Sequence, residues 1–198
     1  MNDENDKDLL TIKTVLIGDS GVGKTSIINQ FTKNEFDSEI EASISSQYNS
    51  KIINIKEIEK EIKFDIWDTA GQEIYRSLAK IFYKDSKIII LVYDITNKKS
   101  FDGIKQYWYK QVSSISNNTH PILALVGNKS DLYNNQDVND EEALKYAESI
   151  GAIFQKISAK SNNGIDTLFK NVGRKFLIQI LIIKKKKIKK KNYIILEK

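Results

Sequence analysis

Cysteine is absent from this sequence of 198 residues, and proline occurs only once. The absence of cysteine excludes disulfide bonds and cysteine-based metal sites, and it is compatible with an intracellular protein. No internal repeat or low-complexity linker divides the chain, and 40% of its residues are hydrophobic. A chain of this length and composition can bury one substantial core, so we expect one folded domain.

Long apolar runs are also absent. The longest, residues 176–183, holds eight residues and is interrupted by Gln179. A membrane-spanning helix needs about 20 apolar residues, so this run is too short to be one. Residues 1–10 are mostly polar and acidic. We therefore expect no signal peptide at this end.

Excess positive charge is confined to one segment. Seven lysines lie within residues 184–191, and Glu197 cancels Lys198, so subtracting seven from the net charge of +5 leaves −2 for residues 1–183. The predicted domain is mildly acidic, and its charge does not favour binding to nucleic acid. The lysine segment has two interpretations, a surface attracted to anionic lipid or a solvated run of charge.

Apolar runs alternate with amphipathic segments, which is typical of an α/β fold. The segments predicted as strands are residues 11–17, 47–55, 61–67, 88–93, 121–127 and 152–157. The predicted helices begin near Ser26 or span residues 73–84, 101–115, 140–149 and 165–176. A charged turn at residues 56–60 separates the second strand from the third, which predicts an antiparallel hairpin. We expect a six-stranded, mostly parallel sheet with one antiparallel edge strand and helices on both faces.

Residues 18–25 read GDSGVGKT and match the phosphate-binding pattern G-x-x-x-x-G-K-[ST]. The glycines allow successive backbone N–H groups to turn toward a pyrophosphate, and the lysine adds a point charge. The string follows a predicted strand and opens a predicted helix, as a P-loop NTPase fold requires. Lys24 is therefore expected to reach the β- and γ-phosphates, and the Thr25 hydroxyl to bind Mg²⁺.

A second string, WDTAGQ at residues 67–72, begins at the end of a predicted strand. Asp68 supplies a carboxylate ligand for Mg²⁺. Gly71 can bring its N–H close to a terminal phosphate, and Gln72 can orient a water molecule for in-line attack. In isolation such an aspartate would more often cap a helix, and such a glutamine would more often lie on the surface. Their order in one string favours the catalytic interpretation.

A third string, NKSD at residues 128–131, follows another buried strand. The Asp131 carboxylate can accept hydrogen bonds from the N1–H and the exocyclic amine of guanine, and adenine has neither of these donors. The tetrapeptide alone would also suit a polar turn. Ser158, Ala159 and Lys160 follow the sixth predicted strand, so that a backbone N–H of this loop can meet the guanine oxygen. Asn128 and Asp131 together disfavour a P-loop ATPase or kinase.

In this order the three strings resemble those of a Ras-superfamily small GTPase, most closely the Rab family, over residues 13–178. Residues 67–79, WDTAGQEIYRSLA, and 92–96, VYDIT, resemble the early-endosomal Rab branch. The resemblance implies that Phe36 packs against the base and that Lys129 and Lys160 flank it.

The resemblance also divides the chain. It implies a polar extension at residues 1–10, a small GTPase domain at 11–180 and a lysine-rich tail at 181–198. It further implies that residues 40–48, the first switch, and residues 71–83 contact an exchange factor, a GTPase-activating protein and effectors. We expect the chain to be a monomer.

The site residues predicted in this way form three sets. The catalytic set is Gln72, Lys24 and Gly71. The set that binds GTP or GDP is Asp19, Ser20, Gly21, Val22, Gly23, Lys24, Thr25, Ser26, Phe36, Ser43, Gly71, Asn128, Lys129, Asp131, Ser158, Ala159 and Lys160. The set that binds Mg²⁺ is Thr25, Ser43 and Asp68.

The sequence departs from the Rab pattern at several positions. Ser43 stands where the family has threonine, Ser45 where Rabs usually carry glycine, and Ile74 where arginine is common. Serine keeps the hydroxyl but loses the methyl group that restricts χ1, so the closed switch should be held less firmly. Rab tails usually end in prenylated cysteines, and this sequence contains no cysteine.

The resulting expectation is a GTP/GDP switch that hydrolyses GTP slowly and regulates vesicle-mediated membrane traffic in an endocytic step. No inserted helical domain supplies an arginine in cis, so rapid hydrolysis requires an activating partner. We expect a cytoplasmic protein that is peripheral on the cytosolic face of endomembranes. The alternative is a scaffold that binds guanine nucleotide without cycling; Ser43 and Ser45 leave this open, and Gln72 argues against it.

Overall fold

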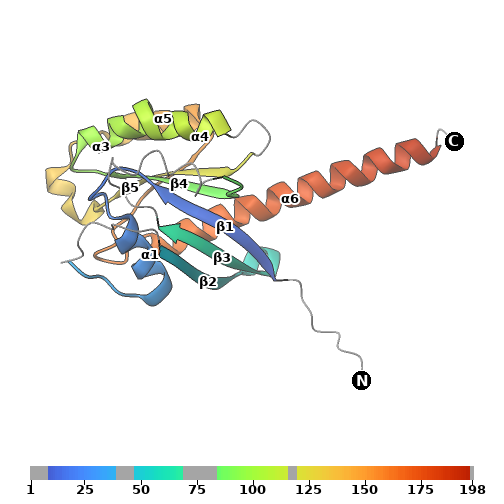
Figure 1. Ribbon diagram of the computed structural model, residues 1–198, viewed down its shortest axis with the longest axis horizontal. Helices are drawn as coiled ribbons and strands as arrows, with labels where there is room; N and C mark the ends of the chain where they lie inside the picture. The colour runs from blue at the N-terminus through green and yellow to red at the C-terminus, as the bar shows by residue number, and fades with distance from the viewer. Residues whose placement is uncertain (1–8, 39–46, 69–83, 116–119, 197–198) are drawn as a thin grey trace, which may run out of the picture.

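A β-sheet runs through the centre of the molecule (Figure 1). The computed structural model describes residues 9–38, 47–68, 84–115 and 120–196, with the backbone alone for residues 115 and 187–196. The strands are β1 (Leu10–Ile17), β2 (Gln47–Ile55), β3 (Lys60–Asp68), β4 (Ile88–Asp94), β5 (Ile122–Asn128) and β6 (Ile153–Lys156). They lie in the order β2-β3-β1-β4-β5-β6.

The helices connect these strands. They are α1 (Lys24–Lys33), α3 (Lys98–Gly103), α4 (Tyr109–Ile115), α5 (Asp140–Ser149) and α6 (Ile165–Leu196), with the short turns η1 (Lys56–Ile58) and η5 (Ser130–Asn135) and the π-helical turn η3 (Ile104–Trp108). Only β2 and β3 pair antiparallel within the described sheet; the other neighbouring strands are parallel. The predicted fold class and hairpin are confirmed.

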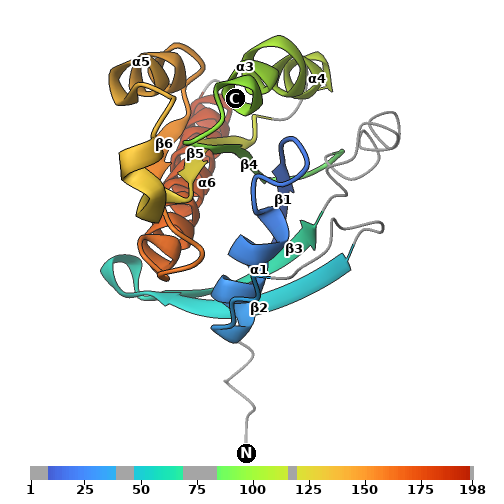
Figure 2. The ribbon, with the colours of Figure 1, turned by 90° about the vertical axis from the view of Figure 1, so that its left-hand side faces the viewer.

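Two apolar layers cover the sheet, one on each face. Every residue of β4 is buried, because alternate side chains enter opposite layers. Ile88, Ile90 and Val92 join the layer that includes α1 and α6. Ile89 and Leu91 join the layer that includes α3, η3 and α5. Figure 2 shows these two groups of helices on opposite sides of the sheet.

The predicted element boundaries lie close to those of the structure. The helix predicted at residues 140–149 has those bounds, and the segment predicted as one helix at 101–115 contains the π-helical turn η3 between α3 and α4. The helix predicted at residues 165–176 is much longer in the structure, where α6 continues through the lysine segment to Leu196 (Figure 1). The helix predicted at 73–84 lies outside the described residues. None of the described helices is long and apolar enough to cross a membrane.

Candidate nucleotide-binding site

The loop between β1 and α1 contains glycines with positive φ angles, a conformation that other residues rarely adopt. Gly18 has a φ of +152°, and a Cβ built there would lie 2.1 Å from the Val92 carbonyl oxygen. Gly23 precedes α1 with a φ of +92°, and a Cβ there would lie 2.4 Å from Nδ2 of Asn128. Any side chain at Gly18 or Gly23 would therefore displace the loop from β4 or β5. These contacts fix residues 18–25, the phosphate loop, against the sheet.

Lys24 folds back across this loop. Its side chain is buried with the residue only 5% exposed, and Nζ donates hydrogen bonds of 2.9 Å to the carbonyl oxygens of both Gly18 and Asp19. Burial lowers the pKa of Lys24 to about 8, although the carboxylates of Asp68 and Asp19 favour its charged form. The loop thus holds an ammonium group that lacks full hydration, and such a group gains more than an exposed lysine from an arriving phosphate.

Thr25 and Asp68 meet next to the phosphate loop. The Thr25 hydroxyl lies in the first turn of α1 and donates a hydrogen bond of 2.6 Å to Oδ2 of Asp68, the last residue of β3. Asp68 is 1% exposed. A hydroxyl and a carboxylate are the hard oxygen donors that Mg²⁺ prefers, and Mg²⁺ usually takes its other ligands from water and phosphate. The chemistry of these two side chains fits this ion.

Asn128 connects three loops. Its side-chain amide donates a hydrogen bond of 2.9 Å to the Val22 carbonyl in the phosphate loop. Its side-chain oxygen accepts one of 3.1 Å from the Ala159 N–H in the loop after β6. The residue is 2% exposed and ends β5. Asn128 therefore holds the phosphate loop and the predicted guanine loops in one unit.

Asp131 is oriented by the loop after β6. Ser158 is fully buried, and its Oγ donates a hydrogen bond of 2.5 Å to Oδ1 of Asp131. The Ser161 N–H in turn donates to the Ser158 hydroxyl at 3.0 Å, which leaves the hydroxyl proton for Asp131. Lys160 is exposed, and Phe36 is 38% exposed. The roles proposed for Lys160 and Phe36 beside a base stay predictions.

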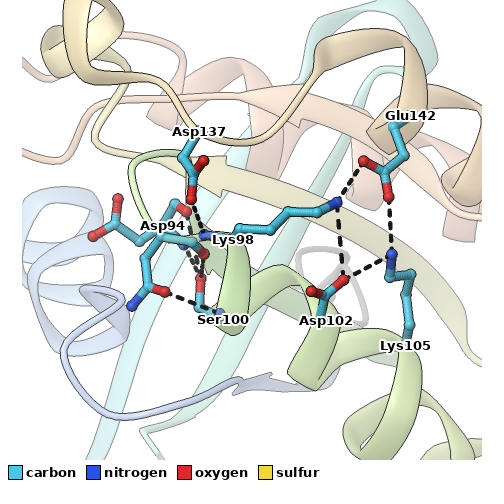
Figure 3. Close-up of polar contacts among 8 residues, drawn as sticks. Asp94, Lys98, Ser100, Asp102, Lys105, Asp137 and Glu142 are labelled. Atoms are coloured by element: carbon cyan, nitrogen blue, oxygen red, sulfur yellow. Dashed lines mark hydrogen bonds and ion pairs between the residues drawn. The ribbon is translucent and has the colours of Figure 1, made fainter.

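Asp94 belongs to this site, although the sequence analysis assigned it no role. Its Oδ2 lies 2.7 Å from Nζ of Lys129, whose backbone is left-handed with a φ of 66°. Its Oδ1 accepts hydrogen bonds from the N–H and the hydroxyl of Thr96. Its own N–H donates to the Ser100 hydroxyl (Figure 3). The sequence feature that could have identified Asp94 is its position as an aspartate at the end of a strand, which is also the feature that identified Asp68.

The structure brings the described members of the predicted site, apart from Phe36, to one rim of the sheet, where β1, β3, β5 and β6 end. Ser20 and Gly21 lie exposed at the tip of the phosphate loop, and Ser26 lies in the first turn of α1. Ser43, Gly71 and Gln72 lie outside the described residues, as do most of the two predicted switch segments. Their roles stay predictions.

Comparison with known proteins agrees with this geometry. The Ras family model matches residues 13–178. RabC of Dictyostelium discoideum is 39% identical over 157 residues, 79% of this chain and 79% of its own length. Human Rab-21 is 39% identical over 167 residues, 84% of this chain and 72% of its own length. Rab5A of rice is 38% identical over 165 residues, 83% and 79% of the two lengths. The chain belongs to the Rab family of Ras-superfamily small GTPases.

Family membership confirms several expectations. The Rab chain binds GTP and GDP, is a GTPase and is a molecular switch in membrane traffic. Rab family members act through regulators and effectors, so the general class of partner is also settled. The names Rab-21 and Rab5A agree with the predicted resemblance to the early-endosomal branch.

Proposed function

We propose that this Rab binds GTP together with Mg²⁺, hydrolyses it slowly to GDP and phosphate, and cycles between the two states on endocytic membranes. The observation that supports this most directly is the double hydrogen bond of Asn128, which joins the phosphate loop to the loops after β5 and β6. The groups needed for phosphates, metal and base are thereby held on one rim.

Each described residue has a task in this proposal. Lys24 neutralises charge on the β- and γ-phosphates from its place across the phosphate loop. Thr25 and Asp68 would hold the Mg²⁺ ion, which would supply positive charge to offset the negative charge that develops during hydrolysis. Ser43 is proposed as the second hydroxyl ligand.

Asp131 provides guanine specificity in the proposal. Its carboxylate accepts from two guanine donors, while Ser158 fixes its orientation. A site of this kind rejects a base without those donors by up to about 10⁴-fold, because the half-buried carboxylate would be covered by the base without gaining its partners. Lys129, held by Asp94, lies against the base from one side.

Hydrolysis is assigned to Gln72, which orients the attacking water, and to the N–H of Gly71, which contacts the γ-phosphate. Both assignments rest on the string at residues 67–72. The intrinsic rate should be slow, and an arginine supplied by an activating partner should raise it by roughly 10³- to 10⁵-fold. Residues 40–48 and 71–83 are the proposed contact regions for this partner, the exchange factor and the effectors.

We also place the protein, by proposal, on the cytosolic face of endomembranes. Exposed apolar residues of α6, among them Leu181 and Ile182, are followed directly by lysines that are exposed from Lys184 to Lys186. Lysines near an anionic bilayer each contribute about 1 kcal/mol of attraction. Sedimentation with vesicles containing phosphatidylserine, compared with neutral vesicles, tests this part; equal binding to both would contradict it.

A single-turnover assay tests the central proposal. GTP hydrolysis should require Mg²⁺, stop with excess EDTA, and be inhibited by unlabelled GTP and not by ATP. In the presence of an activating cell extract, Gln72→Leu should retain bound GTP and lose the acceleration. If the parental protein binds GTP and hydrolyses none of it with or without extract, the chain is a non-cycling scaffold and the proposal fails.

A further inference from the structure

The phosphate loop has a second side-chain anchor besides Asn128. The indole Nε1–H of Trp108 donates a hydrogen bond of 2.8 Å to Oδ1 of Asp19, the second residue of the loop. The two residues are 89 positions apart in the sequence. Trp108 is 1% exposed, and it lies in the apolar layer formed by α3, η3 and α5. This contact ties the loop to a helix outside the three motif strings.

A π-helical turn and a glycine lie where the helix meets the phosphate loop. Trp108 ends the π-helical turn η3, in which the N–H of Tyr109 bonds to the carbonyl of Ile104. Gly103, directly before this turn, comes so close to the loop that a Cβ there would lie 2.7 Å from Oδ2 of Asp19. The Asp19 carboxylate is therefore held between the Gly103 backbone and the indole. Single π-helical turns occur frequently at functional sites.

The same aspartate also holds the phosphate-binding lysine. The Asp19 carbonyl oxygen accepts from Nζ of Lys24 at 2.9 Å, while the Asp19 side chain accepts from Trp108. A hydrogen bond to a carboxylate is shorter and stronger than one between neutral groups. If the Asp19 side chain shifted, the carbonyl oxygen of the same residue, which positions the Lys24 ammonium group, would shift with it.

We propose that Trp108 is a positioning residue for nucleotide binding, which holds the phosphate loop through Asp19 and thereby sets how slowly GDP is released. The proposal rests on guanine-nucleotide binding by this Rab and adds a determinant outside its nucleotide-binding motifs. Asn128 anchors the loop at Val22, and Trp108 anchors it at Asp19, so the loop is fixed on both sides of its tip.

The test is the rate of GDP release from the full chain, measured with a fluorescent GDP analogue. Trp108→Phe keeps an aromatic ring in the core and removes the N–H donor, and it should release GDP about tenfold faster, as expected for one charge-assisted hydrogen bond. Asp19→Ala removes the acceptor from the loop side and should produce a similar acceleration. The double variant should be no faster than the faster single variant, because both changes break the same contact.

Ile104→Val is the matched control. Ile104 begins the same π-helical turn and is fully buried in the same apolar layer. Ile104→Val should lower the melting temperature while both partners of the Trp108–Asp19 hydrogen bond are kept, and it should change GDP release less than twofold. A purely structural role for Trp108 would instead make both variants release GDP in proportion to their loss of melting temperature, and that result would overturn the proposal.

An NMR measurement tests the hydrogen bond between Trp108 and Asp19 directly. It depends neither on the rate of nucleotide release nor on whether the Trp108→Phe variant folds. The chain has two tryptophans, so a ¹H–¹⁵N spectrum has two indole N–H signals, and Trp67→Phe assigns them. The Trp108 signal should move upfield in Asp19→Ala and stay in place in Ile104→Val. An unchanged Trp108 signal in Asp19→Ala, or additive rate effects in the double variant, would contradict the proposal.

Discussion

The two ends of the nucleotide site are held in different ways. At the phosphate end, residues 18–25, the backbone is closely packed in addition to its side-chain anchors Asn128 and Trp108: Gly18 lies against the Val92 carbonyl, and Lys24 donates to two carbonyls of the loop. At the base end, residues 128–131 and 158–160, side chains bond to one another, as Asp131 does to Ser158. At the phosphate end, we therefore expect almost any added side-chain volume to weaken nucleotide binding strongly. At the base end, we expect smaller effects that depend on which chemical group of a side chain is changed.

The largest effect should come from added volume at the phosphate end. Gly18→Ala would place a Cβ 2.1 Å from a backbone oxygen, at a φ of +152°. The loop must move, and a displacement of about 1 Å should weaken GDP binding by roughly a hundredfold or more. Gly151→Ala is the control, because Gly151 also has a positive φ, has open space around it and lies outside the site. Titration calorimetry should find GDP affinity unchanged in that variant.

The second effect concerns base recognition. Asp131→Asn exchanges one acceptor oxygen for an amide donor while the side chain keeps its shape. The loss of a charge-assisted hydrogen bond should lower GDP affinity by roughly 10- to 100-fold. It should also reduce the preference for GDP over inosine diphosphate, which lacks the exocyclic amine. Competition binding measures both ratios; an unchanged preference would remove Asp131 from the base-recognition site.

A smaller effect should follow when Lys129 loses its partner. Asp94→Asn keeps the hydrogen bonds to Thr96 and removes the charge that faces Nζ of Lys129 at 2.7 Å. We expect about fivefold faster GDP release, since the pair is partly buried. Asp137→Asn is the control: this nearby carboxylate accepts from the Lys98 N–H and makes no ion pair with Lys129 in the described part of the structure. Equal rates in the two variants would show that Asp94 does not orient Lys129.

The smallest effect should come from a network that belongs to neither end. Glu142 pairs with Lys98 and Lys105, and Lys105 also pairs with Asp102 (Figure 3). The Lys98 hydrogen bond, followed by that of Lys105, lowers the pKa of Glu142 from its ordinary value of 4.5. A carboxylate with a lowered pKa stabilises the fold above pH 4.5. This stabilisation is lost as the pH falls through the lowered pKa.

Glu142→Gln should therefore cost less than about 1 kcal/mol of unfolding free energy at pH 7, because these side chains are about one third exposed and solvent screens them. Urea unfolding at pH 7 and pH 3 measures the difference, which should shrink at the lower pH. GDP release should equal that of the parent. A stability loss that is the same at both pH values would show that the pair does not act through charge.

Much of the fold could be predicted because the relevant signals are local. The fully apolar run at residues 88–93 becomes the buried strand β4, and the acidic start of the segment at 140–149 becomes the first turn of α5, capped by Asn139. The interruption at η3 could not be predicted, because the apolar residues there keep an ordinary helical spacing. The continuation of α6 also escaped prediction, since a lysine run has no apolar periodicity to read.

The sequence by itself determined which chemical groups the site contains. The positions of Lys24, Thr25, Asp68 and Asp131 at or just after the ends of β1, β3 and β5 are a local property, and parallel strands bring their carboxyl ends to one rim. Only the tertiary structure decided which groups restrain them. Asp94 reaches Lys129 from the neighbouring strand, and Trp108 reaches Asp19 across 89 residues. Such pairs leave no spacing pattern, because their distance is set by how strands and helices pack rather than by their separation along the chain.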